Sequence, residues 1–169
     1  MLVTGEAPRA ATPRGPRPRI ERLADHPEAL PVLAAWFEAE WPSHYGPDGP
    51  GDARRDLDDC ARRGELPIGF VAYVGDELCG TMALKRESVT ILPHLSPWVA
   101  AGLVPALRRR QGIGAALLDA VEEIARRLGF TRLYCGTAAA MGLLERSGWR
   151  FRERVDYGGE DVAVYEKDL

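Results

Sequence analysis

The strongest hydrophobic pattern in this 169-residue chain runs from Ile113 to Leu128. Apolar side chains recur there at helical spacing, and charged side chains occupy the opposite face. The apolar positions are Ile113, Leu117, Val121, Ile124 and Leu128, flanked by Ala116, Ala120 and Ala125, and the charged ones are Asp119, Glu122, Glu123, Arg126 and Arg127. Gly129 suits the residue that follows a helix C-terminus. The pattern predicts a long amphipathic helix with Glu122 on its solvated face.

Shorter apolar runs on either side of this helix predict the other elements. A strand is expected over residues 20–23, followed by a helix from Asp25, where Asp25 and Glu28 form a capping box. A turn-rich loop follows Trp41, and then a weaker helix over 52–63. The remaining expected elements are strands over 68–74, 78–86, 98–104, 132–136, 149–155 and 162–166, and a short helix over 138–146. The predicted order is β-α-α-β-β-β-α-β-α-β-β in one domain without internal repeats.

Composition indicates a soluble globular protein. Apolar residues make up 46% of the chain and the formal net charge is −3, which disfavours a disordered or nucleic-acid-coating protein. No apolar run reaches the ~18 residues that a membrane span needs, and no secretory signal is visible. The three cysteines, Cys60, Cys79 and Cys135, are widely spaced, so neither a disulfide framework nor a zinc site is expected. We expect a cytoplasmic protein without a metal and without membrane or nucleic-acid partners.

The first residues of the chain differ from the rest. They are rich in Pro, Ala and Arg and have almost no large apolar side chains. Such a segment cannot bury enough surface to offset the loss of chain entropy. We therefore expect a flexible tail over residues 1–18 and a single folded domain over residues 19–169.

A basic loop with two glycines precedes the long helix. Arg108, Arg109 and Arg110 lead into Gln111-Gly112-Ile113-Gly114. The first turn of a helix has unpaired N–H groups, glycine lets a ligand approach the backbone, and arginine matches phosphate oxygens. The loop predicts a phosphate or pyrophosphate site, and the alternative is a solvated arginine run before a flexible helix start.

Two nucleotide-binding motifs do not fit this loop. The chain contains no GxxxxGK[ST] string, which excludes a P-loop. A dinucleotide fingerprint needs a third Gly or Ala where Leu117 stands, and an acidic residue near the end of the next strand, where residues 132–137 have none.

The loop does resemble the acetyl-CoA pyrophosphate loop of the GNAT superfamily of N-acetyltransferases, R/Q-x-x-G-x-G/A. The matching residues are Arg109-Arg110-Gln111-Gly112-Ile113-Gly114. Three further segments resemble the family in the right order: residues 95–104 its central strand, residues 143–149 (LLERSGW) its LYExxGF segment, and residues 162–167 its closing strand. The resemblance covers about residues 18–169. It implies an α/β (α+β) fold, with a mixed, mostly antiparallel sheet of six to seven strands flanked by about four helices.

The resemblance also implies an activity, acetyl-CoA-dependent N-acetyl transfer to a primary amine by direct attack in a ternary complex. A small molecule is the favoured acceptor. The strands before and after the long helix are expected to splay apart, with the pantetheine arm paired to the backbone near Leu103 and Val104. A backbone N–H at Leu103 would then polarise the thioester carbonyl. The expected contacts of the cosubstrate acetyl-CoA are Leu103, Val104, Arg109, Arg110, Gln111, Gly112, Ile113 and Gly114.

The chain departs from the family pattern at the groups that move protons. Leu144 stands where the family has the Tyr that reprotonates the thiolate, and Tyr134 is the candidate substitute. One extra residue after Pro105 leaves open whether Arg108 or Arg109 contacts the pyrophosphate.

The general base is open as well. Glu40 is the candidate, and His44, His94 and Glu87 are alternatives. Seven acids between Glu38 and Asp59 would concentrate a cationic amine if they face the acceptor, and the alternative is a solvated helix face.

Three other functions remain open at this point. One is a non-catalytic acyl-CoA-binding or sensor protein of the same fold, and another is acetylation of a protein N-terminus or lysine. A nucleic-acid binder is opposed by the net acidic charge. Pairing of two copies through the closing strands is a further expectation of the resemblance.

Overall fold

The computed structural model describes residues 15–169. The predicted tail over residues 1–18 therefore lies mostly outside the described residues. Among residues 15–169, no helix combines the length and the apolar character needed to cross a membrane. Within the same part of the chain, no three His, Cys, Asp or Glu side chains are grouped so that they would hold a metal ion.

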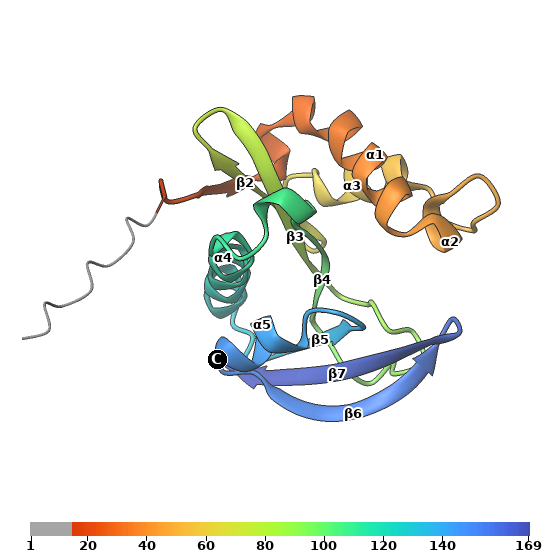
Figure 1. The fold of residues 1–169 in the computed structure, drawn as a ribbon. Coiled ribbons are helices and arrows are strands. Elements are labelled where there is room, and N and C mark those ends of the chain that lie inside the picture. Colours follow the sequence, from red (N-terminus) through yellow and green to blue (C-terminus); the bar gives the residue numbers. More distant parts are fainter. Residues whose placement is uncertain (1–14) are drawn as a thin grey trace, which may run out of the picture.

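A single seven-stranded sheet forms the centre of the fold (Figure 1). The strands are β1 (Arg19–Arg22), β2 (Ile68–Val74), β3 (Glu77–Lys85), β4 (Trp98–Leu103), β5 (Arg132–Thr137), β6 (Arg150–Tyr157) and β7 (Glu160–Asp168). Their order in the sheet is β1-β2-β3-β4-β5-β7-β6. Only β4 and β5 run parallel, since every other neighbouring pair is antiparallel. The predicted mixed, mostly antiparallel sheet is confirmed.

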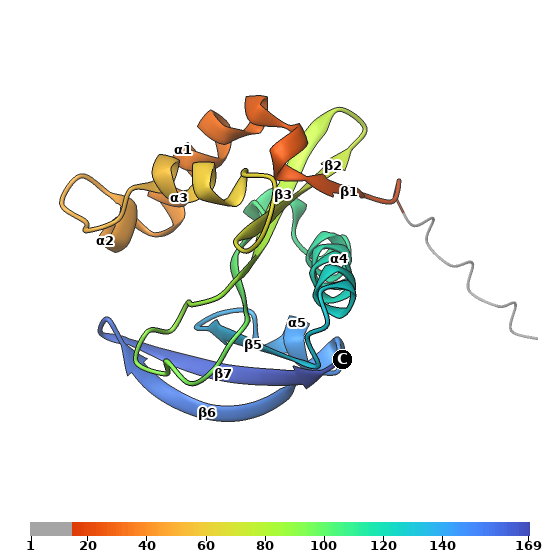
Figure 2. The ribbon, with the colours of Figure 1, turned by 180° about the vertical axis from the view of Figure 1, so that it is seen from behind.

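Helices cover both faces of this sheet (Figure 2). The helices are α1 (Leu30–Glu40), α2 (Pro42–Tyr45), α3 (Ala53–Cys60), α4 (Ile113–Arg127) and α5 (Met141–Arg146), with short 3-10 turns at Leu23–Asp25, Pro27–Ala29 and Ala106–Arg108. Alternate residues of a strand point to opposite faces. Val71 and Ala83 accordingly pack with α1 and α3, while Ala72 and Leu84 pack with α4. The α4 face and the α1–α3 face are therefore separate cores, divided by the sheet.

Two local predictions in the N-terminal region are wrong. The capping box at Asp25 and Glu28 does not form, because two 3-10 turns occupy this segment and α1 begins only at Leu30. Glu28 instead contacts His26, whose Nδ1 lies 2.8 Å from Glu28 Oε1 and whose other ring nitrogen contacts Glu21. The loop after Trp41 contains the extra short helix α2, where Pro42 occupies the first position that tolerates it.

The long helix was predicted correctly in extent but not at every position. It runs from Ile113 to Arg127, and Gly129 after it has a φ of +85°. Glu122, however, is 3% exposed and not on a solvated face. Its carboxylate accepts bonds of 2.9 and 2.8 Å from Lys167 Nζ on β7 and one of 3.1 Å from Trp149 Nε1. The prediction failed because helical spacing cannot show that a distant lysine and indole will cover a charged position.

Candidate active site

Strands β4 and β5 lie side by side only near their N-terminal ends. Trp98 pairs with Tyr134 and Val99 pairs with Cys135, and the ladder ends there. Beyond Val99, the edge of β4 that faces β5 has no strand partner in the described chain. Ala101 adopts a φ of +53°, and the register between β3 and β4 shifts nearby. The centre of the sheet opens into a split with free backbone on the β4 side, as the resemblance predicted.

The split leads to the N-terminus of α4. Gly112 caps this helix with a φ of +81°, and a Cβ added there would meet no atom within 4 Å. The first amide that bonds back into this end of the helix is that of Ala116, which donates to Gly112 O over 3.0 Å. Among residues 15–169, the amides of Ile113, Gly114 and Ala115 have no hydrogen-bond acceptor. Open space in front of free N–H groups is what a phosphate needs.

The arginines before α4 have different partners. Arg108 bonds to Glu77 at the start of β3, with a distance of 3.1 Å between Nε and Oε1. Arg109 donates from Nε to the carbonyl of Val104 over 2.9 Å, and its side chain remains 52% exposed. The 3-10 turn at Ala106–Arg108 absorbs the extra residue of the loop. Arg108 is thus held at β3, whereas Arg109 is exposed next to Val104 and Glu40, and which of the two contacts a pyrophosphate stays a prediction.

Two other residues complete the environment of the loop. Arg110 is exposed and has a φ of +61°, and Gln111 donates from Nε2 to the carbonyl of Leu107 over 3.2 Å. Gly114 is the second residue of α4, where an added Cβ would come within 2.9 Å of Leu143 Cδ2 on α5. The second glycine thus allows α5 to pack closely against the start of α4.

The remaining site residues predicted on the strands lie at opposite ends of the split. Tyr134 is at the closed end, where its ring packs against Trp98 at a centroid distance of 5.7 Å. Leu103 and Val104 are at the open end, next to the loop, and the Leu103 side chain is buried toward α1 and α3. Leu144 is 2% exposed in the core on the α4 side, so this position offers no proton donor.

Glu40 is the last residue of α1, and its carboxylate lies next to the loop. Its Oε1 is 3.5 Å from a terminal nitrogen of Arg109. The sequence predicted both residues for the site but not this contact, which joins the acceptor-side helix to the loop before α4. Its role in proton transfer stays a prediction.

The acids of the acceptor side are mostly engaged with neighbours. Asp52 caps α3 by accepting from the Arg55 amide over 2.9 Å, and Asp58 pairs with Arg54 over 3.0 Å. Asp56 accepts a bond of 2.8 Å from the hydroxyl of Tyr45. Burial and this bond raise the pKa of Tyr45, so its hydroxyl stays a donor. Much of the predicted acidic wall is thus a capped and paired helix face.

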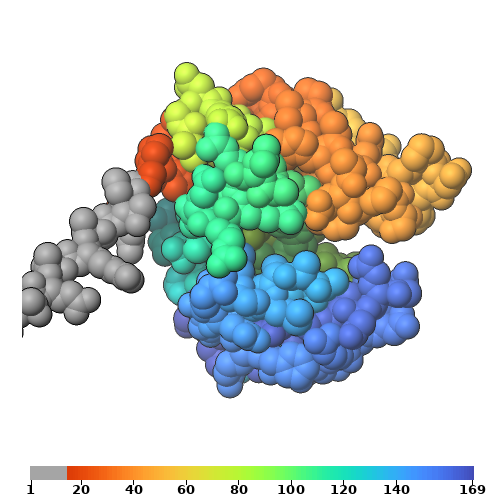
Figure 3. Space-filling view, in the orientation of Figure 1, coloured from red at the N-terminus to blue at the C-terminus, as the bar shows by residue number. Residues whose placement is uncertain are grey.

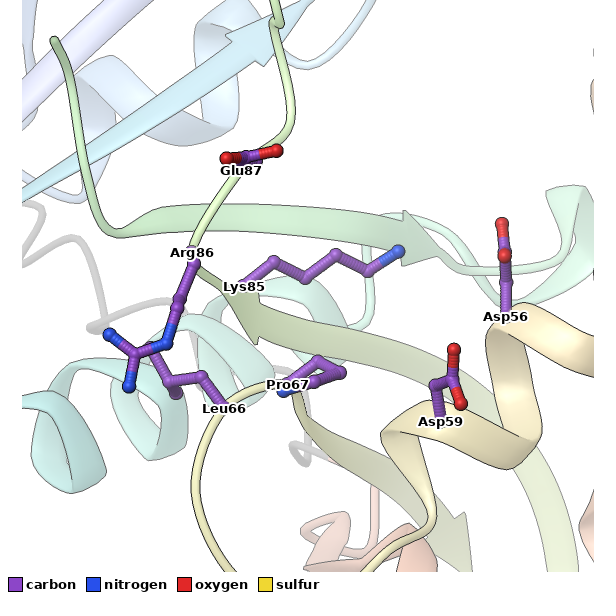
Figure 4. A pocket seen from close by; sticks show the side chains of 7 residues that line it. All are labelled: Asp56, Asp59, Leu66, Pro67, Lys85, Arg86 and Glu87. Atoms are coloured by element: carbon purple, nitrogen blue, oxygen red, sulfur yellow. The ribbon is translucent and has the colours of Figure 1, made fainter. Parts of the chain in front are cut away.

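A hollow runs between α1–α3 and the C-terminal strands (Figure 3). On the α3 side of the sheet there is a pocket of about 290 Å³, which we call the α3 pocket (Figure 4). It is lined by Asp56 and Asp59 of α3, Leu66 and Pro67 of the following loop, and residues 85–87 at the end of β3. Glu87 was predicted from the sequence as an alternative base, whereas Lys85 was not predicted for the site, although a lysine at the end of an apolar strand was a visible signal.

The two other base candidates are exposed, and Cys135 lies at the last pair of the β4–β5 ladder. His44 is exposed, with its ring 4.5 Å from that of Tyr45, and His94 is exposed in the loop before β4. Burial raises the pKa of the Cys135 thiol to about 12, so it is not a nucleophile near neutral pH.

Known proteins that resemble this chain in sequence or structure are acetyltransferases. The model of the Acetyltransferase (GNAT) family matches residues 33–149. No curated protein sequence matches the chain significantly. An aminoglycoside 6'-N-acetyltransferase complexed with coenzyme A has a similar structure, with a TM-score of 0.71 and 14% identity over 89% of this chain and 96% of that one. An N-acetyltransferase from Staphylococcus aureus Mu50 has a TM-score of 0.71 and 18% identity over 90% and 98% of the two chains.

A third similar structure is Ard1 from Thermoplasma volcanium, with a TM-score of 0.67 and 14% identity over 90% and 97% of the two chains. At these identities the structures establish a shared fold, and the family model extends over most of the domain. The split sheet, the free amides of α4 and the exposed Arg109 fit the acetyl-CoA that such enzymes use. The chain belongs to the GNAT family of acetyltransferases.

Proposed function

We propose that this acetyltransferase transfers the acetyl group of acetyl-CoA to the primary amine of a small molecule, by direct attack within a ternary complex. The observation that carries the proposal is the split between β4 and β5, which leads from the free amides of α4 to the hollow beside α1–α3. One ligand can reach the split along the loop and the other from the hollow. Holding both in one cleft supplies much of the rate by proximity.

The residues of the chain would divide the work as follows. The amides at the start of α4, together with Arg109, Arg110 and Gln111, bind the phosphates of acetyl-CoA, which supplies an activated acetyl group. The unpaired edge of β4 up to Leu103 and Val104 pairs with the pantetheine amides, and an N–H of this edge polarises the carbonyl. Tyr134 is the proposed proton-transfer group, whereas Glu40, which lies 3.5 Å from Arg109, is proposed to restrain the arginine of the donor loop. A thiol with a pKa near ~8.5 leaves tolerably well without an acid, so Leu144 does not preclude turnover.

A small acceptor is favoured over a protein by the size of the α3 pocket, about 290 Å³, near the lower end of small-molecule sites. The aminoglycoside 6'-N-acetyltransferase with a similar structure is an acetyltransferase of a small molecule, which supports the same assignment. We expect the enzyme to release coenzyme A thiol with members of a small-amine panel. Lysine-rich and N-terminal peptides should give no release.

Two glycines provide a matched test of the donor site. Gly112 and Gly129 flank α4 with φ values of +81° and +85°, and neither would meet an atom within 4 Å as alanine. Gly112→Ala and Gly129→Ala should therefore each lower the free energy of unfolding by about 1–2 kcal/mol, the cost of a left-handed L-residue. Only Gly112→Ala places a methyl group in front of the free amides.

The measurement is thermal unfolding with and without acetyl-CoA. At a hundred times its dissociation constant, acetyl-CoA should stabilise the wild type and Gly129→Ala by about 2.7 kcal/mol and Gly112→Ala by much less. Equal stabilisation of both variants would contradict the assignment of the loop. Stabilisation without thiol release for any amine would instead indicate an acyl-CoA-binding protein.

A further inference from the structure

The α3 pocket contains charged side chains of both signs, and most of them already have partners. Asp56 accepts from Tyr45 over 2.8 Å, and Asp59 pairs with Arg62 over 2.8 Å. Arg86 pairs with Glu65 over 3.1 Å and points away from Lys85 (Figure 4).

Lys85 differs from these residues. It crosses the middle of the pocket with its amine directed toward Asp56, and it is partly buried (Figure 4). Across the described residues 15–169, the Lys85 ammonium makes neither a hydrogen bond nor an ion pair within 4.0 Å. A partly buried ammonium loses some hydration, and an anion in the pocket would compensate for that loss.

The strand register places Lys85 across β4 from the closed end of the split. Lys85 is the β3 partner of Trp98, and Ala83 is the partner of Ala100. The parallel ladder of β4 and β5 ends at Val99, one residue beyond the partner of Lys85, and the split begins there. Ala83 packs toward α1 and α3, and Lys85 lies two residues further along the same strand, so its side chain projects from that same face. The α3 pocket thus lies on the α1–α3 face of the sheet, next to the part of β4 where the split begins.

We propose that the acceptor is an amine that also carries a carboxylate, as an amino acid does, and that Lys85 binds this carboxylate. The inference rests on the proposed function and narrows its substrate class. The carboxylate and the amine of an α-amino acid are attached to the same carbon, so an acceptor held at Lys85 keeps its amine within the same pocket. Asp56, Asp59 and Glu87 line that pocket and favour the ammonium group before it is deprotonated.

The reaction balances without a covalent enzyme intermediate. A bond forms between the amine nitrogen and the acetyl carbon, and the bond between that carbon and sulfur breaks. The ammonium loses two protons in all, of which one ends on the thiol of coenzyme A and the other in solvent.

The test compares amino acids with their carboxamides, which have the same side chain and amine but no negative charge. Release of coenzyme A thiol is measured for each pair with the wild type, Lys85→Gln, Lys85→Arg and Arg86→Gln. Taking the ratio of variant to wild-type kcat/KM for each acceptor cancels the difference in amine basicity within a pair. Arg86→Gln is the matched control, because Arg86 lines the same pocket but pairs with Glu65.

We expect Lys85→Gln to lower kcat/KM for the amino acids by about 10- to 100-fold, the loss of one charge-assisted hydrogen bond, with little change for the carboxamides. Lys85→Arg should retain most of the preference, and Arg86→Gln should retain all of it. Acetyl-CoA should stabilise Lys85→Gln against heat as it does the wild type, which shows that the fold and the donor site are intact.

Two results would overturn the inference while leaving the proposed function in place. One is that carboxamides or simple amines are acetylated by the wild type while amino acids are not, and the other is an equal loss for both members of a pair in Lys85→Gln. If no amine of the panel releases thiol although acetyl-CoA binds, the proposed function fails and this inference fails with it.

Discussion

The contact between Glu40 and Arg109 gives the sharpest test of how the acceptor side and the donor loop interact. The two side chains are 46% and 52% exposed, and their closest charged atoms are 3.5 Å apart. At that distance two unit charges in water attract each other by about 1.2 kcal/mol. Salt and the ordering of two long side chains reduce the net value to about 0.2–1 kcal/mol. Arg109 must give up this contact to turn fully toward a phosphate.

Glu40→Gln should therefore strengthen acetyl-CoA binding by about 1.4- to 5-fold, the range that corresponds to 0.2–1 kcal/mol. The dissociation constant is measured by calorimetry at low salt and again near ~1 M salt, where a Debye length of about 3 Å should remove the difference. Glu38→Gln is the control, since Glu38 is exposed on the same helix and has no ion pair within residues 15–169. We expect kcat of Glu40→Gln to remain within a few-fold of wild type.

Two outcomes would refute this reasoning. Weaker acetyl-CoA binding would show that Glu40 holds Arg109 in its binding orientation and does not compete with the phosphates. A fall in kcat of about 100-fold or more would show that Glu40 takes the proton from the amine, the role predicted from the sequence.

Further predictions concern the buried charge and the thiols. Glu122→Ala should lower the free energy of unfolding by about 3–5 kcal/mol, because it leaves Trp149 Nε1 without an acceptor and the Lys167 ammonium without its carboxylate, with only the Ser147 carbonyl remaining. Glu123→Ala, which removes an exposed helix pair, should change it by less than about 0.5 kcal/mol. Urea unfolding measures both variants, and similar values would contradict the buried position of Glu122. Burial raises the pKa of Cys135 to about 12, so stability is complete below the ordinary thiol pKa and should fall as pH rises above about 8.5. Alkylation followed by mass spectrometry at pH 8 should modify Cys135 in the unfolded chain and not in the folded one, and rapid modification of the folded protein would contradict this.

The sequence was sufficient wherever one element carries its own signal. The period of apolar residues determines α4, and alternating or continuous apolar runs separated by Gly75 and by Gly158-Gly159 determine the hairpins β2–β3 and β6–β7. These features depend on contacts between residues close in the chain, so they can be predicted locally. The motif before α4 likewise predicts a phosphate site, and the structure places free amides, glycines and arginines contiguously there.

Local signals failed where a distant residue competes for the same group. The capping box was displaced because His26 binds both Glu21 and Glu28, and Glu122 is buried because Lys167 from the far end of the chain reaches it. Neither partner can be inferred from spacing along a helix.

The residues that surround the proposed acceptor pocket come together only through tertiary structure. The sequence by itself indicated the family, the order of the elements and the loop proposed to bind acetyl-CoA, since each depends on a pattern within about thirty residues. It could not place Lys85 in the α3 pocket or Glu40 against Arg109, because those positions follow from how β3 pairs with β4 and how α1 packs over the sheet. Substrate choice depends on side chains that converge from separate elements, and only the folded chain brings them together.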